Sequence, residues 1–233
     1  MKKITKLWGL LLIAPALLSF SQGETPSAAD RDEVHRFIRN SWDKTVRFNT
    51  EDEGTRIGLP YRYTVPSISG AFQEMYYWDT YFTGEGLILD GHVDLARSNA
   101  ENMLYMVDRF GKMYNGNLTV FQNRSQPPFL SMMIASVYRS TGDKEWLRKV
   151  LPTLEKEYRF WMSERIAPTG LNRYGNEGTE QDKTDFVNML KERLGSNFKT
   201  EGKSHAELLD IGSHYIAEAE SGWDFNPRFR TRC

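Results

Sequence analysis

The sequence contains little cysteine, carries almost no net charge and does not show residue spacings typical of metal sites. Its single cysteine, Cys233, excludes an intrachain disulfide framework and a thiolate metal cluster. Thirty Lys and Arg residues stand against 31 Asp and Glu residues, so the net charge of −1 provides no basic field for nucleic acid. The 4 histidines lie far apart, and neither a G-x-S-x-G nucleophile elbow nor a phosphate-binding glycine loop occurs. With 39% hydrophobic and 26% charged residues, we expect a globular protein without a nucleic-acid partner, metal or cofactor.

The longest apolar run lies at the N-terminus, in residues 7–18, where it follows three lysines. A basic start, a short apolar run and small residues before the polar chain are typical of a cleavable secretory signal. A bilayer-spanning helix takes about 20 apolar residues, so this run is too short to span comfortably, although a retained signal anchor is the alternative. We expect an exported protein, periplasmic or secreted, that has no membrane partner after cleavage. The expected division is a signal peptide over 1–21, a linker over 22–29 and one domain over 30–233.

Apolar residues recur at helical spacing along most of the remaining chain, and convincing strand patterns are scarce. Asp30 and Asp143 are suited to cap helices, and Pro127 can occupy a first helical turn. The sequence therefore predicts an all-α fold of helical hairpins with long loops. The expected helices cover 30–47, 93–109, 127–140, 143–163 and 204–219, and an apolar, aromatic segment over 74–89 forms a hairpin with the second of them. The expected loops cover 49–71, 111–125 and 167–184, and the charged residues 177–203 are expected to be the most mobile.

Three segments combine aromatic side chains with carboxylates, amides or arginine, which is the chemistry of a sugar site. A pyranose ring offers C–H faces for aromatic stacking and hydroxyls for paired hydrogen bonds. In the first segment Trp78 and Asp79 stand side by side at the start of a helical stretch. In the second, Asn115 precedes Arg124 and Gln126, which point the same way in an extended chain. The alternative is a structural role for both segments. In the first, Trp78 would fill the core and Asp79 would place a negative charge at a helix N-terminus; in the second, the polar side chains would cap a loop.

The third segment places Asp224 between two aromatic residues, just after Gly222 ends the last predicted helix. Removal from water raises the pKa of a carboxyl group and suits it to donate a proton. Cleavage of a glycosidic bond requires such an acid. The alternative is a capped helix end with packed aromatic rings.

These segments give the chain a resemblance to the trehalases of glycoside hydrolase family 37, from about Thr64 to Arg230. The resemblance rests on five blocks in the family's order and at similar spacing. The blocks are Phe72-x-Glu74-x-Tyr76-x-Trp78-Asp79-x-Tyr81-Phe82, Asn115-Gly116-Asn117, Arg124-Ser125-Gln126-Pro127-Pro128-Phe129, Leu171-Asn172-Arg173-Tyr174 and Glu220-Ser221-Gly222-Trp223-Asp224-Phe225.

The resemblance implies the N-terminal part of an (α/α)6 toroid and an inverting glycoside hydrolase, with α,α-trehalose as the expected disaccharide substrate and glucose as product. It makes Asp224 the general acid. No cofactor is implied, because two carboxyl groups and water are sufficient for this reaction. The positions that match sugar-binding residues are Phe72, Trp78, Asp79, Asn115, Arg124 and Gln126.

The chain departs from the family pattern in three ways. Ala71 replaces a family arginine, and an Arg-Pro-Glu-Ser run has no counterpart in residues 175–190. The family's catalytic base lies in a C-terminal part that this chain lacks, so another chain could supply that part. Besides the hydrolase, the sequence leaves open an inactive fragment or sugar-binding remnant without a base, and a helical interaction scaffold.

Overall fold

The computed structural model describes residue 25 and residues 27–224, and the chain divides into one unit that ends at Ile38 and another that begins at Arg39. Helix α1 (Ala28–Arg39) accounts for most of the described part of the first unit. The expected signal peptide, half of the expected linker and residues 225–233 lie outside the described residues.

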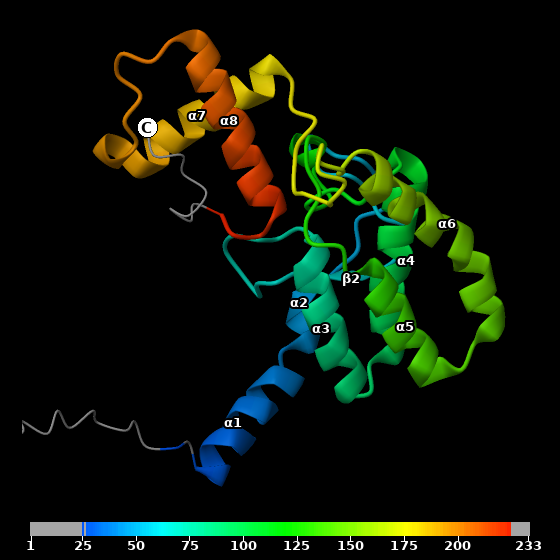
Figure 1. The fold of residues 1–233 in the computed structure, drawn as a ribbon. Coiled ribbons are helices and arrows are strands. Elements are labelled where there is room, and N and C mark those ends of the chain that lie inside the picture. Colours follow the sequence, from blue (N-terminus) through cyan, green and yellow to red (C-terminus); the bar gives the residue numbers. More distant parts are fainter. Residues whose placement is uncertain (1–24, 26, 225–233) are drawn as a thin grey trace, which may run out of the picture. The chain divides into compact units, whose positions relative to one another are not determined.

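Helices dominate the second unit, which confirms the expected all-α class (Figure 1). Its two short strands, β1 (Val46–Arg47) and β2 (Tyr63–Thr64), pair antiparallel, with Val46 opposite Thr64. The helices are α2 (Trp42–Thr45), α3 (Tyr77–Leu89), α4 (Val93–Phe110), η1 (Thr119–Phe121), α5 (Leu130–Thr141), α6 (Lys144–Ser163), α7 (Glu180–Leu194), η2 (Gly195–Asn197) and α8 (His205–Glu220).

Local sequence signals account for most helix boundaries. The α3–α4 hairpin turns at Gly91, whose φ of +87° lies in the left-handed region that glycine tolerates. The Asp143 carboxylate accepts a hydrogen bond from the Trp146 amide and caps α6 as expected. Helix α5 begins at Leu130 and not at residue 127, since a residue that precedes a proline is disfavoured in the helical region.

Other expectations about secondary structure are also wrong. Asp30 does not cap the first helix, because it lies in the first turn of α1, which begins at Ala28. The helix predicted over 30–47 is interrupted, because α1 ends at Arg39 and α2 begins at Trp42. Residues 180–194, predicted as loop and mobile chain, form α7. A capping box begins this helix, in which Thr179 and Asp182 each accept a hydrogen bond from the other's backbone amide. Two buried residues, Val187 and Leu190, stand three apart among its charged residues.

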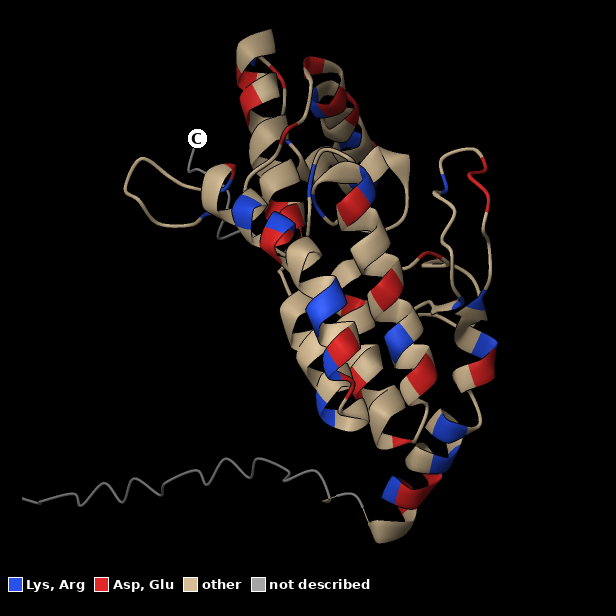
Figure 2. Ribbon diagram, turned by 90° about the vertical axis from the view of Figure 1, so that its right-hand side faces the viewer, with Lys and Arg blue, Asp and Glu red and all other residues tan. Residues whose placement is uncertain are grey.

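The apolar core of the second unit lies around α4, which packs against α3, α5 and α6. Buried amides on α4 attach the long loop over 49–71 to this core, because Asn99 accepts a hydrogen bond from the Thr64 amide and Asn102 accepts one from the Tyr61 amide. Acidic and basic residues are interspersed along the helices of this region (Figure 2). The side chains at the centre of the core are Leu87, Met103, Met106, Leu130 and Ile134, all 0 to 1% exposed.

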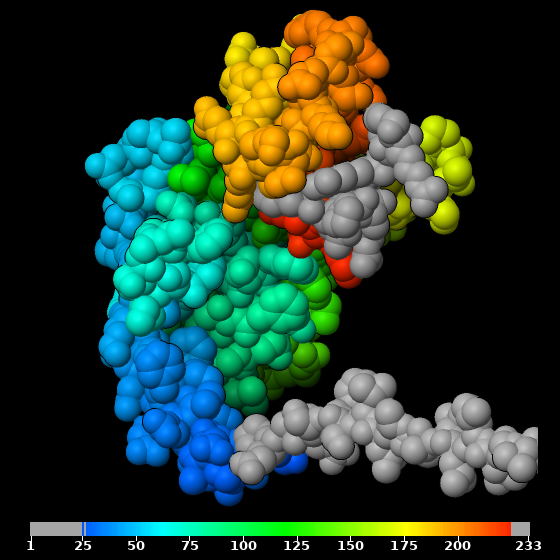
Figure 3. All heavy atoms as spheres, turned by 90° about the vertical axis from the view of Figure 1, so that its left-hand side faces the viewer, coloured from blue at the N-terminus to red at the C-terminus, as the bar shows by residue number. Residues whose placement is uncertain are grey.

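Helices α7 and α8 pack mainly against each other. They form a second block with η2, shown in yellow, orange and red in Figure 3. The last turn of α8 approaches the loop over 111–126, because the Asn115 side chain donates to the Ala219 carbonyl. The end of α8 and the start of α3 therefore lie in one neighbourhood.

Candidate active site

A pocket of about 240 Å³ opens where the start of α3, the loop over 115–126 and the end of α8 converge. Both apolar rings and polar groups line it, as a sugar site requires. The lining residues are Pro66, Phe72, Tyr76, Trp78, Asp79, Asn115, Gln126, Gly222 and Asp224.

The structure brings together six of the seven residues that the sequence proposed for the site. Arg124 does not line the pocket and lies behind its wall. Three lining residues were not proposed. Tyr76 belongs to the aromatic block that was recognised and Gly222 to the block of Asp224, whereas nothing in the sequence marks Pro66. The six that line the pocket are Phe72, Trp78, Asp79, Asn115, Gln126 and Asp224.

Trp78 and Asp79 occupy the first turn of α3, where backbone amide groups find no acceptor one turn earlier in the helix. Gln126 fixes this turn, because its side-chain oxygen accepts a hydrogen bond of 3.1 Å from the Trp78 amide. Gly222 packs on the indole of Trp78 so closely that a Cβ atom there would lie 2.7 Å from the ring. The Trp78 ring thus touches the chain segment that carries Asp224.

Asn115 joins the elements that surround the pocket. Its backbone carbonyl accepts from the Tyr77 amide at 3.0 Å, and its backbone amide donates to the Arg124 carbonyl at 3.1 Å. Its side-chain nitrogen donates to the carbonyls of Ser125 and Ala219 at 3.3 and 3.4 Å. One amide residue therefore connects α3, the following loop and α8.

The pocket contains two carboxyl groups, and both have raised pKa values. Burial is the main cause of the rise in the pKa of Asp79. Partial burial also raises the pKa of Asp224, although the residue is exposed overall and the positive charge of Arg124 opposes the rise. Each carboxyl group therefore keeps its proton to a higher pH than it would in water, as a general acid requires.

Arg124 is 9% exposed and lies against aromatic rings behind the pocket wall. Its guanidinium carbon stands 4.8 Å from the centroid of Phe121 and 5.4 Å from that of Phe186. Burial lowers the pKa of Arg124 to about 10, against the opposing charges of Asp224 and Glu220. Arg124 therefore remains charged at neutral pH and acts on Asp224 as a fixed positive charge.

Phe72 is the only described non-glycine residue with positive φ, at +62°. A bulky residue in the left-handed region is strained, and such strain is common at binding sites. The ring is 59% exposed and meets Tyr76 edge-on, with the centroids 5.8 Å apart. The backbone conformation thus presents an aromatic face at the pocket.

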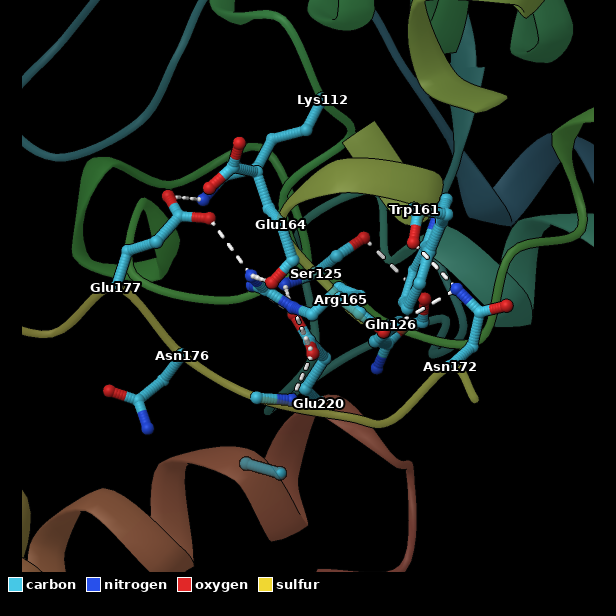
Figure 4. Close-up of polar contacts among 12 residues, drawn as sticks. Lys112, Ser125, Gln126, Trp161, Glu164, Arg165, Asn172, Asn176, Glu177 and Glu220 are labelled. Carbon is cyan, nitrogen blue, oxygen red and sulfur yellow. Dashed lines mark hydrogen bonds and ion pairs between the residues drawn. The ribbon is translucent and has the colours of Figure 1, made fainter. Parts of the chain in front are cut away.

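Glu220, the carboxylate four residues before Asp224, is fully buried and occupied by other contacts. Both of its oxygens bind Arg165, at 2.7 and 2.8 Å (Figure 4). It cannot accept a proton from a water molecule in the pocket while these bonds hold. Glu220 therefore has a structural role. Among the described residues that line the pocket, we assign no carboxylate as the catalytic base.

Two further findings concern metal and membrane. Among the described residues, no group of three or more His, Cys, Asp and Glu side chains is arranged to hold a metal ion. A search of the same residues finds no helix that is both long and apolar enough to cross a membrane.

Comparison with known proteins identifies the family. A family model described as Trehalase matches residues 21–232. The chain belongs to the trehalase family. A solved member, neutral trehalase Nth1 from Saccharomyces cerevisiae, has a TM-score of 0.56 and 24% identity, with 84% of this chain and 40% of that chain covered. This likeness shows the fold, which is the expected part of an α/α toroid.

Curated relatives match most of this chain but only part of their own length. A probable trehalase of Oryza sativa subsp. japonica is 33% identical, with 76% of this chain and 32% of that protein covered. The periplasmic trehalase of Xanthomonas campestris pv. campestris is 34% identical, with 81% and 34% covered. A periplasmic trehalase of Escherichia coli is 30% identical, with 89% and 38% covered. The chain spans about a third of the length of the relatives it matches.

Proposed function

We propose that this chain supplies the sugar-binding wall and the general acid of a glycoside hydrolase that cleaves α,α-trehalose to glucose. The observation that carries the proposal is the pocket in which the Asp224 carboxyl, its pKa raised by burial, stands with Trp78 and Asp79. Family membership and the names of the relatives support trehalose as the substrate.

In the proposed reaction, Asp224 donates its proton to the glycosidic oxygen as the bond from that oxygen to the anomeric carbon breaks. A water molecule forms the new bond to the anomeric carbon from the opposite face and loses a proton to a second carboxylate. We place that base outside the described pocket, in a part of the family fold that this chain or another chain supplies. The reaction yields two glucose molecules and consumes one water, so it needs no cofactor.

The binding residues have separate parts in this proposal. Trp78 and Phe72 pack on the C–H faces of a glucose ring, while Asp79, Asn115 and Gln126 take its hydroxyls. Arg124 acts from behind the wall through its charge on Asp224.

Calorimetric titration with trehalose, together with an assay for released glucose, tests the proposal. We expect the chain to bind trehalose, and we expect Asp224→Asn to retain binding, since asparagine keeps the shape of the side chain without the acidic proton. Where turnover is observed, this substitution should remove it. A folded chain that neither binds trehalose nor releases glucose would contradict the proposal, and binding without turnover would favour a sugar-binding protein.

The stereochemistry of the products tests the inverting course. Inversion at the attacked carbon of α,α-trehalose releases one glucose as the β anomer, while the leaving glucose keeps its α configuration. Proton NMR of the first products should therefore show both anomers in equal amounts before they interconvert. Early release of α-glucose alone would contradict inversion.

We also propose that the protein is exported by a signal peptide over residues 1–21. The basic and apolar N-terminal sequence supports this, as do relatives named as periplasmic trehalases. Expression of the full chain followed by N-terminal sequencing of the exported protein should give a mature chain that begins near Gln22. An uncleaved protein retained inside the cell would contradict export.

A further inference from the structure

A cluster of charged side chains that the proposed reaction does not use lies beside the loop segment of Ser125 and Gln126 (Figure 4). Its centre is the pair of Arg165 and Glu220, whose side chains are 2% and 0% exposed. The Arg165 Nε and Nη2 atoms donate to the two oxygens of Glu220 at 2.7 and 2.8 Å, which is a bidentate pair. Glu220 is the last residue of α8 and precedes Asp224, which lies beyond the helix, by four residues.

Glu220 also binds two backbone amides from different loops. It accepts a hydrogen bond of 2.8 Å from the Ser125 amide and one of 2.6 Å from the Gly175 amide. Ser125 stands between Arg124 and Gln126, the two polar side chains of the loop that faces α3. One carboxylate therefore holds the end of α8, from which the chain continues to Asp224, to the loop that carries the binding residues.

The other side of Arg165 extends the cluster. Its Nη1 atom donates to Glu177 at 3.2 Å, and Glu177 also forms an ion pair with the buried Lys112. Burial favours a lower pKa for Arg165, but the charges of Glu220 and Glu177 outweigh it and raise that pKa. Arg165 therefore stays charged and keeps Glu220 in place over the whole physiological pH range.

The chemistry of this pair suits orientation better than stability. A buried ion pair loses hydration that its attraction only partly restores, and well-packed apolar residues stabilise a core as well or better. Its hydrogen bonds, however, are directional and fix the position of both partners. The four bonds to Glu220 set the position of the chain around Ser125 relative to the end of α8.

We propose that Arg165 and Glu220 are positioning residues that hold the general acid Asp224 in register with the sugar-binding loop of Arg124 and Gln126. This inference rests on the proposed function, because the acid and the binding residues are assigned there. Arg165 and Glu220 touch no substrate in this scheme.

Glu220→Gln tests the proposal, because glutamine has the same shape but cannot accept the bidentate pair. Calorimetric titration of the full chain should show trehalose affinity weakened by about tenfold or more, equivalent to about 1.4 kcal/mol. A spectroscopic signal should report the moved helix end. In protein labelled with 5-fluorotryptophan, the resonance of Trp78, assigned through Trp78→Phe, should shift because Gly222 packs on that ring.

Glu177→Gln is the matched control. It removes an ion pair from the same arginine, but among the described residues the Glu177 side chain has its hydrogen bonds and ion pairs with Arg165 and Lys112, and not with Ser125 or α8. We expect near wild-type affinity and an unmoved Trp78 resonance. Equal effects of both substitutions, or a folded Glu220→Gln variant with wild-type affinity and resonance, would overturn the proposal.

A second variant decides the matter if Glu220→Gln fails to fold. Arg165→Lys keeps the charge but loses the fork that binds both oxygens. Weakened binding with a shifted Trp78 resonance in this folded variant supports positioning, and wild-type behaviour overturns it. If the wild-type chain itself does not bind trehalose, the proposed function fails, and the Trp78 resonance alone still shows whether the pair sets the position of the helix end.

Discussion

Two regions of the second unit are held together by different kinds of interaction. The region from Ile57 to Val150, with α3, α4, α5 and part of α6, encloses one continuous apolar core. The α7–α8 hairpin adds no described residue to that core, and hydrogen bonds and ion pairs join the hairpin and the segment before it to the rest of the unit. We call these contacts the polar seam. Its residues are Lys112, Asn115, Asn123, Ser125, Arg165, Gly175, Glu177, Asp182 and Glu220.

The difference explains where the pocket lies. Apolar burial stabilises in proportion to area but has no direction, whereas hydrogen bonds fix distances and angles. The core therefore supplies stability, and the polar seam sets the positions of groups that must act together. Trp78 comes from the core side of the pocket and Asp224 from the hairpin side, so the pocket forms where the seam joins the two regions.

Substitution in the core should give the largest change in stability. Leu87 is 0% exposed, and Leu87→Ala should lower the free energy of unfolding by about 2 to 5 kcal/mol, since it removes apolar contacts and leaves a cavity. Urea denaturation measures this change. The control is Leu89→Ala on the same helix, where a residue that is 86% exposed should change stability by no more than about 0.5 kcal/mol. Similar losses at both positions would contradict a core centred on the inner face of α3.

The core contains one ionisable pair, which should make its stability depend on pH. Glu157 on α6 is 5% exposed and accepts a hydrogen bond from the Tyr77 hydroxyl. Burial raises the pKa of Glu157 from 4.5 to about 7, so the folded state holds the proton more tightly than the unfolded state. The resulting stabilisation is fully present below pH 4.5 and is lost as the pH rises to about 7. The loss should be on the order of 3 kcal/mol.

Glu157→Gln isolates this effect, because glutamine keeps an acceptor for Tyr77 and does not titrate. Urea denaturation at a series of pH values should show a smaller fall in stability from pH 4.5 to 7 for this variant than for the wild type. Glu155→Gln, at an exposed position of the same helix, should leave the wild-type pH dependence intact. An unchanged pH profile in the Glu157→Gln variant would show that the carboxyl group is ionised in the folded core.

Substitution of Gly222, which lies two residues beyond the seam residue Glu220, should affect both stability and binding. At Gly222, a φ of +74° and ring atoms of Trp78 at 2.7 to 3.1 Å from a built Cβ atom both oppose a side chain. Gly222→Ala should cost about 1 to 2 kcal/mol through its backbone. It should also weaken trehalose affinity by about tenfold, because the chain that carries Asp224 must move. Gly170→Ala, with a φ of +82° and no atom within 4 Å of its Cβ position, should show the backbone cost alone. If Gly222→Ala and Gly170→Ala weaken trehalose affinity equally, the loss of affinity does not arise in the pocket.

Local signals in the sequence predicted one part of the fold well and missed another. Asp143 and Ser204 each precede a helix as side-chain caps, and the expected helices after them are confirmed. Helix α7 was missed because only Val187 and Leu190 are buried along it, and their spacing is hard to see among charged neighbours. Helix α7 depends on its tertiary contact with α8, and the local sequence does not reveal that contact.

The candidate site shows the same limit. The residues that line the pocket could be named because aromatic rings next to carboxylates and amides indicate sugar chemistry, and because these blocks resemble the trehalase family. The pair of Arg165 and Glu220 could not, since 55 residues separate its partners and nothing in the sequence gives their distance. Arg124 was predicted to line the pocket because of its residue type. Its burial behind the pocket wall depends on the rings of Phe121 and Phe186.

The smallest expected effect concerns Phe72, which belongs to neither the core nor the polar seam. Phe72→Ala and Phe72→Gly both remove the exposed ring, so each should weaken trehalose affinity by a few-fold, in line with about 0.5 to 1.5 kcal/mol for an aromatic contact. Only glycine relieves the positive φ of +62°, so the glycine variant should be more stable than the alanine variant by about 1 kcal/mol. Calorimetry and urea denaturation separate the two effects, with Phe48→Ala as a control at an equally exposed ring outside the pocket. If the two Phe72 variants have equal stability, the left-handed conformation stores no strain, and the ring is held at the pocket by its contact with Tyr76 alone.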